Sequence, residues 1–230
     1  MRDDIGNAIR SGDVATLTQL VAADPTLAHA RLDGERTLLH IATDWPGHFP
    51  NVRETISELI ARGADMNARF QGGGHSETPL HWAASSDDLN ALNTLLEHGA
   101  DLEAPGAVIG GGTPLADAVA FGQWRAARKL VERGAHSTMW QAAALGLVDR
   151  VQECLSSDPA PSQADVTNAF WCACHGGQLE AADLLLGRGA DFNWVGYDGF
   201  TPFDAAVRNG NREVIDWLTG RGAIQAKGIE

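Results

Sequence analysis

Cysteine and long apolar runs are scarce in this sequence of 230 residues, and each scarcity excludes a class of protein. The three cysteines are Cys154, Cys172 and Cys174. Their odd number and close spacing argue against a disulfide framework and fit a reducing compartment. No stretch approaches the roughly 18 uninterrupted apolar residues of a membrane helix. The first twenty residues also lack an apolar run of signal-peptide length. We therefore expect a cytoplasmic protein that does not enter a membrane.

Basic residues are also few. Lys and Arg total 17 against 30 Asp and Glu, which gives a formal net charge of −13. Such a surface repels the phosphates of nucleic acids and of anionic membranes, so neither is an expected partner. A basic protein surface or a cationic small molecule is a better electrostatic match. Simple solubility is the alternative explanation of the charge.

Two phrases recur along the chain. One begins with threonine, and its copies are Thr37–Ala42, Thr78–Ala83, Thr113–Ala118 and Thr201–Ala206. The other contains Gly-Ala, with its glycine at Gly63, Gly99, Gly134, Gly189 and Gly222. Threonine caps a helix, proline after it fits the first turn, and a glycine ends the following helix. The pattern predicts pairs of helices that bury their apolar faces only by stacking on their neighbours.

These phrases resemble the ankyrin-repeat family, whose unit of about 33 residues carries Thr-Pro-Leu-His-x-Ala. The resemblance covers essentially the whole chain. It implies an all-α solenoid of stacked helix-turn-helix units with short β-hairpin fingers and a concave binding face. It also implies a structural, bridging role for the motif histidines His40 and His81. We expect one array, 1–230, of seven repeats: a cap at 3–32, then 33–69, 70–104, 105–136, 137–163, 164–194 and 195–223.

Departures from the family pattern indicate where a site lies. An insertion, Asp44–Asn51, follows the first helix of the second repeat. Its two prolines prevent it from extending either helix, so we expect Trp45 and Phe49 to fold back near Trp82. The glycines at 72–74 and 110–112 are expected to serve finger turns with positive φ. An irregular junction near 135–137 leaves no room for a finger.

The missing finger is expected to leave a notch. Asp117 and Phe121 would lie before it, and Trp140, Gln141 and Trp171 after it. Aromatic faces beside carboxylates suit a cation or an amphipathic small molecule. The equally open alternative is that Trp140 and Trp171 only fill the space of the missing motif histidines.

No catalytic sequence motif is present, and Cys172 and Cys174 are better interpreted as small core residues than as metal ligands. We expect neither a cofactor nor a metal. The leading hypothesis is a module that binds a protein partner through the concave face. The alternative is a small-molecule-binding protein or enzyme with an aromatic and acidic pocket. Candidate binding residues are Trp45, Glu77, Trp82, Asp117, Phe121, Trp140, Gln141, Trp171, His175, Trp194, Tyr197 and Asp198. Candidate acid–base residues, if the protein is an enzyme, are Asp44, His48, His75, Glu77, Asp117 and His175.

Overall fold

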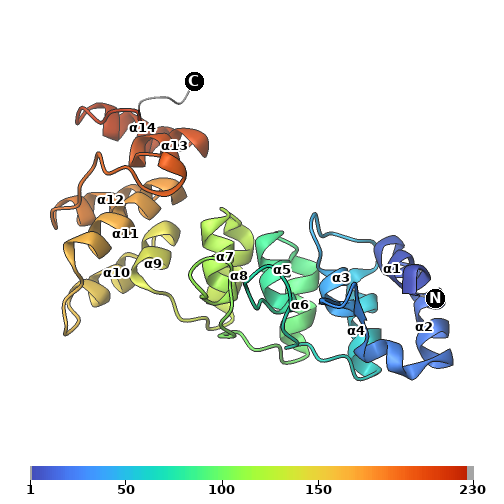
Figure 1. Cartoon of the computed structure of the whole chain (residues 1–230). Helices are drawn as coiled ribbons and strands as arrows, with labels where there is room; N and C mark the ends of the chain where they lie inside the picture. The colour runs from blue at the N-terminus through green and yellow to red at the C-terminus, as the bar shows by residue number, and fades with distance from the viewer. Residues whose placement is uncertain (1, 227–230) are drawn as a thin grey trace. The chain divides into compact units, whose positions relative to one another are not determined.

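The computed structural model describes residues 2–226, in which fourteen α-helices follow one another in pairs (Figure 1). The chain divides into two compact units, whose boundary lies between Ala135 and His136. We call them the N-terminal and the C-terminal unit. No helix within residues 2–226 is both long enough and apolar enough to cross a membrane.

The N-terminal unit contains four helix pairs and one two-stranded sheet. A 3₁₀-helix, Pro25–His29, precedes the sheet, in which β1 (Arg31–Leu32) pairs antiparallel with β2 (Arg36–Thr37). The helices are α1 (Arg2–Ser11), α2 (Val14–Ala23), α3 (Leu38–Ala42), α4 (Val52–Ala61), α5 (Pro79–Ser85), α6 (Leu89–Glu97), α7 (Pro114–Ala120) and α8 (Trp124–Glu132).

The repeated phrases set the helix ends. Thr37, Thr78, Thr113 and Thr201 are the residues before the helices α3, α5, α7 and α13, as the capping argument predicts. The glycines of the Gly-Ala phrase all have positive φ, which only glycine adopts without strain. Small side chains then let neighbouring helices approach closely, since Ala83, Ala84 and Ala91 are completely buried.

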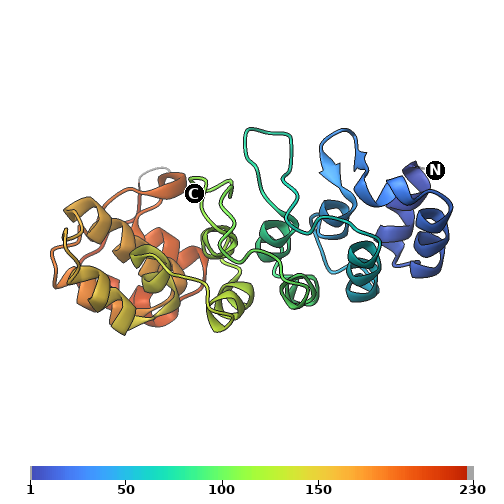
Figure 2. The same cartoon turned by 90° about the horizontal axis from the view of Figure 1, so that it is seen from below.

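The fingers are loops that precede the first helix of a pair. In the N-terminal unit, the loops that precede α3, α5 and α7 project to the same side of the helices (Figure 2). Within residues 2–226 only the first of them is a formal β-ladder. The next two are joined by a backbone bond from Ser76 N to Gly106 O, at 3.2 Å. Positive φ angles at Gly73, Gly74, Gly110 and Gly111 confirm why these fingers are glycine-rich.

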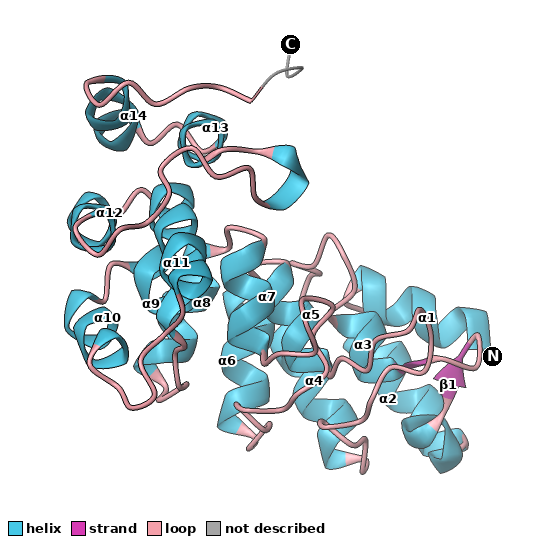
Figure 3. Ribbon diagram, turned by 60° about the vertical axis from the view of Figure 1, so that its left-hand side comes forward, coloured by secondary structure: helices cyan, strands magenta, loops and turns pink. Residues whose placement is uncertain are grey.

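The C-terminal unit contains three helix pairs, and α11 is the longest helix of the described chain. Its helices are α9 (Met139–Leu145), α10 (Val148–Leu155), α11 (Gln163–Gly176), α12 (Leu179–Leu186), α13 (Pro202–Arg208) and α14 (Arg212–Thr219), with a 3₁₀ turn at Tyr197–Gly199. Ser162 and Asp165 form the capping box that begins α11. This helix packs against α9, α12 and α13 (Figure 3).

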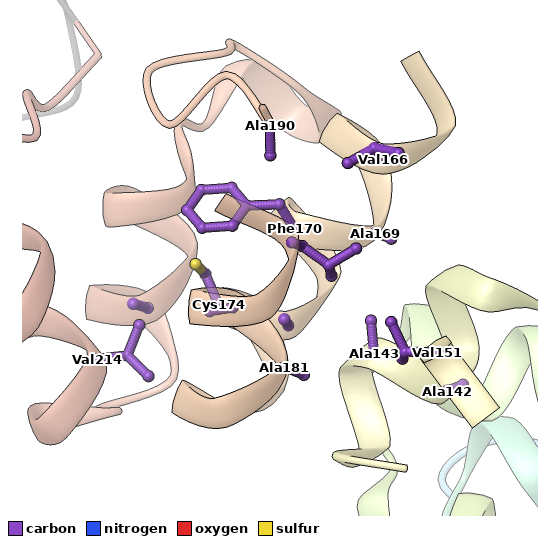
Figure 4. Packing of buried hydrophobic residues seen from close by; sticks show 14 of the residues in the cluster. Ala142, Ala143, Val151, Val166, Ala169, Phe170, Cys174, Ala181, Ala190 and Val214 are labelled. Atoms are coloured by element: carbon purple, nitrogen blue, oxygen red, sulfur yellow. The ribbon is translucent and has the colours of Figure 1, made fainter. Parts of the chain in front are cut away.

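Phe170 occupies the middle of the C-terminal core. It is completely buried, and Figure 4 shows its ring between Ala190 and Cys174. Alanines from α9 and α12 supply much of the surrounding surface. Cys172 and Cys174 are buried free thiols, and burial raises the pKa of both. They are therefore small core residues, as the sequence indicated.

Candidate functional site

Two motif histidines join successive repeats. Nδ1 of His40 lies 2.7 Å from Thr37 Oγ1, and its Nε2 lies 3.1 Å from the carbonyl oxygen of Glu77. His81 does the same, with Thr78 Oγ1 at 2.9 Å and Gly112 O at 3.3 Å. Burial lowers the pKa of each imidazole to about 4. Both rings are therefore neutral at physiological pH and serve as structural bridges, as the family resemblance implied.

Glu77 occupies the position just before the cap of α5, where its carboxylate is held by neighbours. The indole Nε1 of Trp82 donates to Glu77 Oε2 at 2.9 Å, and the Val108 amide reaches Oε1 at 3.4 Å. Nδ1 of His75 lies 2.8 Å from Oε2, although its direction is not that of a hydrogen bond. The Glu77 residue is only 5% exposed. A finger, a first helix and the next finger thus fix one nearly buried carboxylate.

Asp117, in the first turn of α7, is completely buried beside Glu77. Neither of its carboxylate oxygens accepts a hydrogen bond of normal geometry. Burial, and then the neighbouring Glu77 carboxyl, raise the pKa of Asp117 from 3.8 to about 9, which the amide of Ile109 only partly offsets. At neutral pH the Asp117 carboxyl is therefore protonated, and its O–H can donate to Glu77.

Aromatic rings surround this pair. Trp82 packs edge-on against His40, with ring centroids 4.9 Å apart, and Phe70 stacks on His75 at the same separation. The centroids of Phe70 and Trp82 are 5.4 Å apart. These contacts, together with the hydrogen bond to Glu77, fix the orientation of the Trp82 ring.

A cavity of about 220 Å³ opens in front of Glu77 and Trp82. All of its walls belong to the N-terminal unit: Asp44, Trp45, His75, Glu77, Trp82, Ser85, Ser86, Val108 and Phe121. The rim is apolar and accessible, since Trp45 is 81%, Phe121 51% and Val108 49% exposed. Asp44 pairs with Arg36 at 2.8 Å, whereas no Arg or Lys within residues 2–226 forms an ion pair with Glu77 or Asp117. A carboxylate whose basic neighbour is His75, at 2.8 Å, rather than an Arg or Lys thus lies under an aromatic rim.

The insertion contacts the following repeat. The amide of His48 donates to Asp88 Oδ2 at 2.6 Å, and its Nε2 lies 3.1 Å from Ser86 O. Trp45 lies near Trp82, as expected, since both line this cavity, but the Trp45 side chain stays mostly in solvent. The two contacts of His48 hold the insertion so that Trp45 lies at the rim of the cavity. Phe49 is half-buried.

The acid–base candidates do not all converge. Asp44, His75 and Glu77 line the cavity, whereas Asp117 lies behind Glu77 without reaching the surface. The exposed His48 ring points to the Ser86 carbonyl, and His175 belongs to the C-terminal unit, where it stacks on Trp171. Val108 was not among the sequence candidates, because an apolar residue on a glycine-rich finger carries no chemical signal.

Candidates in the C-terminal unit fall into two groups. Trp140 borders a second cavity, of about 370 Å³, between Arg150, Glu153 and Asp165. Gln141 is buried and accepts hydrogen bonds from Thr138, so the histidine position of this repeat's capping box is taken by Gln141 rather than by Trp140.

The other group surrounds Trp171, which is buried and whose Nε1 donates to Phe200 O at 2.9 Å. Trp171 thereby makes the same kind of bridge between repeats as His40 and His81. Tyr197 packs edge-on against both Trp171 and Trp194. Asp198 pairs with Arg208 at 3.0 Å. The notch expected beside residues 135–137 involves both units, and it stays a prediction.

Family models describe most of the chain. A model of three ankyrin repeats matches residues 5–106 and 49–139, and a further model of ankyrin repeats matches residues 170–219. The chain therefore belongs to the ankyrin-repeat family, whose members are generally protein-interaction modules.

Curated relatives share this repeat region over much larger proteins. Palmitoyltransferase AKR1 of Lachancea kluyveri is 28% identical over 218 residues, which cover 94% of this chain and 26% of the relative. An ankyrin repeat and KH domain-containing protein, mask-1 of Caenorhabditis elegans, is 28% identical over 74% of this chain and 6% of its own length. For human SH3 and multiple ankyrin repeat domains protein 2, identity is 26% over 88% of this chain and 12% of the relative. The chain thus spans about a quarter or less of these relatives.

Proposed function

We propose that this chain binds a protein partner through the face formed by its fingers and the first helices of its pairs. The distribution of exposed apolar side chains carries the proposal. The large exposed ones of the described chain are Trp45, Val108, Ile109, Phe121, Val195, Tyr197, Val207 and Ile224. They lie in the insertion, in fingers, on or at the end of first helices and in the segment after α14, and none belongs to a second helix. Within the N-terminal unit, Trp45, Val108 and Phe121 line one cavity, and exposed apolar side chains that lie together mark interaction surfaces.

The net charge of the protein indicates which kind of partner it attracts. With a net charge of −13, the protein attracts basic surfaces and repels acidic ones. The N-terminal unit presents Glu77 at the floor of its cavity, with Asp44 at the wall. A partner that is basic and carries apolar side chains fits both properties of this surface.

Peptide display against the full chain tests the proposal. Selected peptides are titrated against the variants Val108→Ser and Phe121→Ser, which change exposed residues of the face. The matched controls are Arg53→Ser and Glu97→Ser on the second helices α4 and α6, with side chains 57% and 54% exposed. We expect the face variants to weaken binding about tenfold or more and the controls to leave it within about twofold. Equal effects of both pairs would place the partner elsewhere.

A small molecule in the cavity of the N-terminal unit is the second candidate. It is favoured by the cavity itself and by the perturbed Asp117 carboxyl behind it, since such groups cluster at functional sites. Because Asp117 is completely buried, it cannot reach a substrate directly, which favours binding over catalysis. A screen of small cationic and neutral compounds by thermal denaturation tests this candidate. Stabilisation that Phe121→Ser abolishes would support it, and no stabilisation by any compound would remove it.

A further inference from the structure

We propose that the cavity of the N-terminal unit is a recognition pocket for one arginine side chain of the partner, with its guanidinium group over Trp82 and against Glu77. This inference rests on the proposed protein-binding function and names the chemical group of the partner that the cavity recognises.

The charges of the cavity call for a cation. Its lining contains two carboxylates, Asp44 and Glu77, one histidine, His75, and no Lys or Arg. Asp44 is already paired with Arg36 at 2.8 Å and approached by Arg10 at 3.9 Å. The nearly buried Glu77 carboxylate lies 2.8 Å from His75 Nδ1, but it pairs with no Arg or Lys of the described chain. A guanidinium from outside would do for Glu77 what Arg36 does for Asp44.

The volume of the cavity suits one inserted side chain better than a complete small-molecule ligand. Pockets for drug-sized molecules hold about 300–1,000 Å³, and this cavity holds about 220 Å³. Its entrance is bordered by Trp45, Val108 and Phe121, all at least 49% exposed. One side chain of the partner fits the small volume, and apolar residues next to it in the partner can contact the exposed apolar rim.

The chemistry of the walls favours guanidinium over ammonium. A guanidinium is planar and weakly hydrated, stacks on aromatic faces and presents five N–H donors. Trp82 and Phe121 supply the rings, and the Glu77 carboxylate and the hydroxyl oxygens of Ser85 and Ser86 supply acceptors. An ammonium is compact and strongly hydrated, so it loses more on entering a mostly aromatic cavity.

Three synthetic peptides of five residues test the inference with the full chain. They carry arginine, lysine or citrulline at the centre and leucine on both sides. Citrulline keeps the shape of arginine without the charge. We expect the arginine peptide to bind about tenfold or more tightly than the citrulline peptide, and several-fold more tightly than the lysine peptide. Equal binding of arginine and citrulline would overturn the charge recognition, and lysine binding as tightly as arginine would overturn the guanidinium assignment.

Two variants locate the pocket. Glu77→Gln keeps an acceptor for Trp82 and should remove the preference for arginine over citrulline. Phe121→Leu changes an exposed ring, so folding is not at risk, and should weaken the arginine peptide several-fold with little effect on citrulline. The matched control is Glu97→Gln on the second helix α6, where the side chain is 54% exposed. An unchanged arginine preference in both Glu77→Gln and Phe121→Leu would overturn the assignment to this cavity.

The two proposals fail in different ways. Displayed peptides that need Val108 and Phe121 but carry no arginine would overturn this inference and leave the proposed function standing. Displayed peptides that ignore the face would overturn the proposed function. Specific binding of the short arginine peptide at Glu77 would in that case still stand, as recognition of a cation outside a protein interface.

Discussion

Replacing Asp117 by Asn should stabilise the protein at alkaline pH. The wild-type carboxyl is completely buried, and its pKa is raised to about 9 by burial and by Glu77. Because the folded pKa exceeds the unfolded one, the folded state holds a proton that the unfolded state releases. Stability is therefore greatest below pH 4 for this group and falls as the pH rises towards about 9. Asparagine cannot ionise, and its amide N–H can donate to Glu77.

The dependence of the unfolding free energy on pH gives the size of the expected stabilisation. One proton held only by the folded state changes the free energy of unfolding by about 1.4 kcal/mol per pH unit. Between pH 6.5 and 8.5 the variant should gain roughly 2–3 kcal/mol relative to the wild type. His40 and His81 act in the opposite direction at lower pH. Their pKa values are lowered to about 4, so the stability they contribute is lost as the pH falls from about 6.5 to 4. The comparison above pH 6.5 therefore isolates Asp117.

Urea denaturation followed by circular dichroism at several pH values measures this difference. Asp216→Asn, an exposed position on α14, is the matched control and should show no such trend. A difference between Asp117→Asn and wild type that stays constant from pH 6.5 to 8.5 would refute the argument, because the buried carboxyl would then not retain its proton.

Further predictions concern packing, bridging and charge. Gly176→Ala should cost about 1–3 kcal/mol of stability, since its Cβ would lie 1.9 Å from the carbonyl oxygen of Ala144. Gly187→Ala, where the nearest atom is 3.4 Å away, should be tolerated, and equal melting temperatures for both would contradict this. Trp171→Phe removes the indole donor to Phe200 O and should cost about 1–3 kcal/mol, measured by urea denaturation; an unchanged midpoint would show that the bridge is dispensable. Association with a basic partner should slow as salt is raised, because exposed charges are screened beyond about 10 Å at 0.1 M; a salt-independent association rate in stopped flow would exclude electrostatic steering.

The sequence predicts helix ends well because capping is local. Thr78 and Gly99 act through bonds within a few residues of themselves, so their phrase defines the start of α5 and the end of the turn after α6 without knowledge of the rest. The length of α11 was not predicted, because its start depends on Ser162 and Asp165, which belong to no repeated phrase. A similar reason explains why Trp140 was placed at the motif-histidine position, which Gln141 occupies. The repeat lacks one residue between α9 and the turn at Gly146, so aligning it from its start and from its end gives positions that differ by one.

The site is harder to predict for a different reason. Glu77 and Asp117 were both candidates, but their pairing depends on how a finger passes over the first helix of the next repeat. The spacing of residues in the sequence does not indicate that Glu77 and Asp117 are buried together, or that Asp117 is protonated as a result. Likewise Val108 becomes part of the rim only because the finger brings it beside Phe121. The repeat pattern therefore predicts which elements form the proposed binding face. The cavity beside Glu77 depends on contacts between repeats, which the pattern does not predict.

Amide hydrogen exchange of the full chain, with and without a selected arginine-bearing peptide, tests the proposed binding face most directly. We expect the peptide to slow exchange in the fingers 70–78 and 105–113 and in the turn after α7, where Phe121 lies. Exchange in the second helices α4, α6 and α8 should change little. Slower exchange confined to those second helices, with the fingers unaffected, would contradict the account.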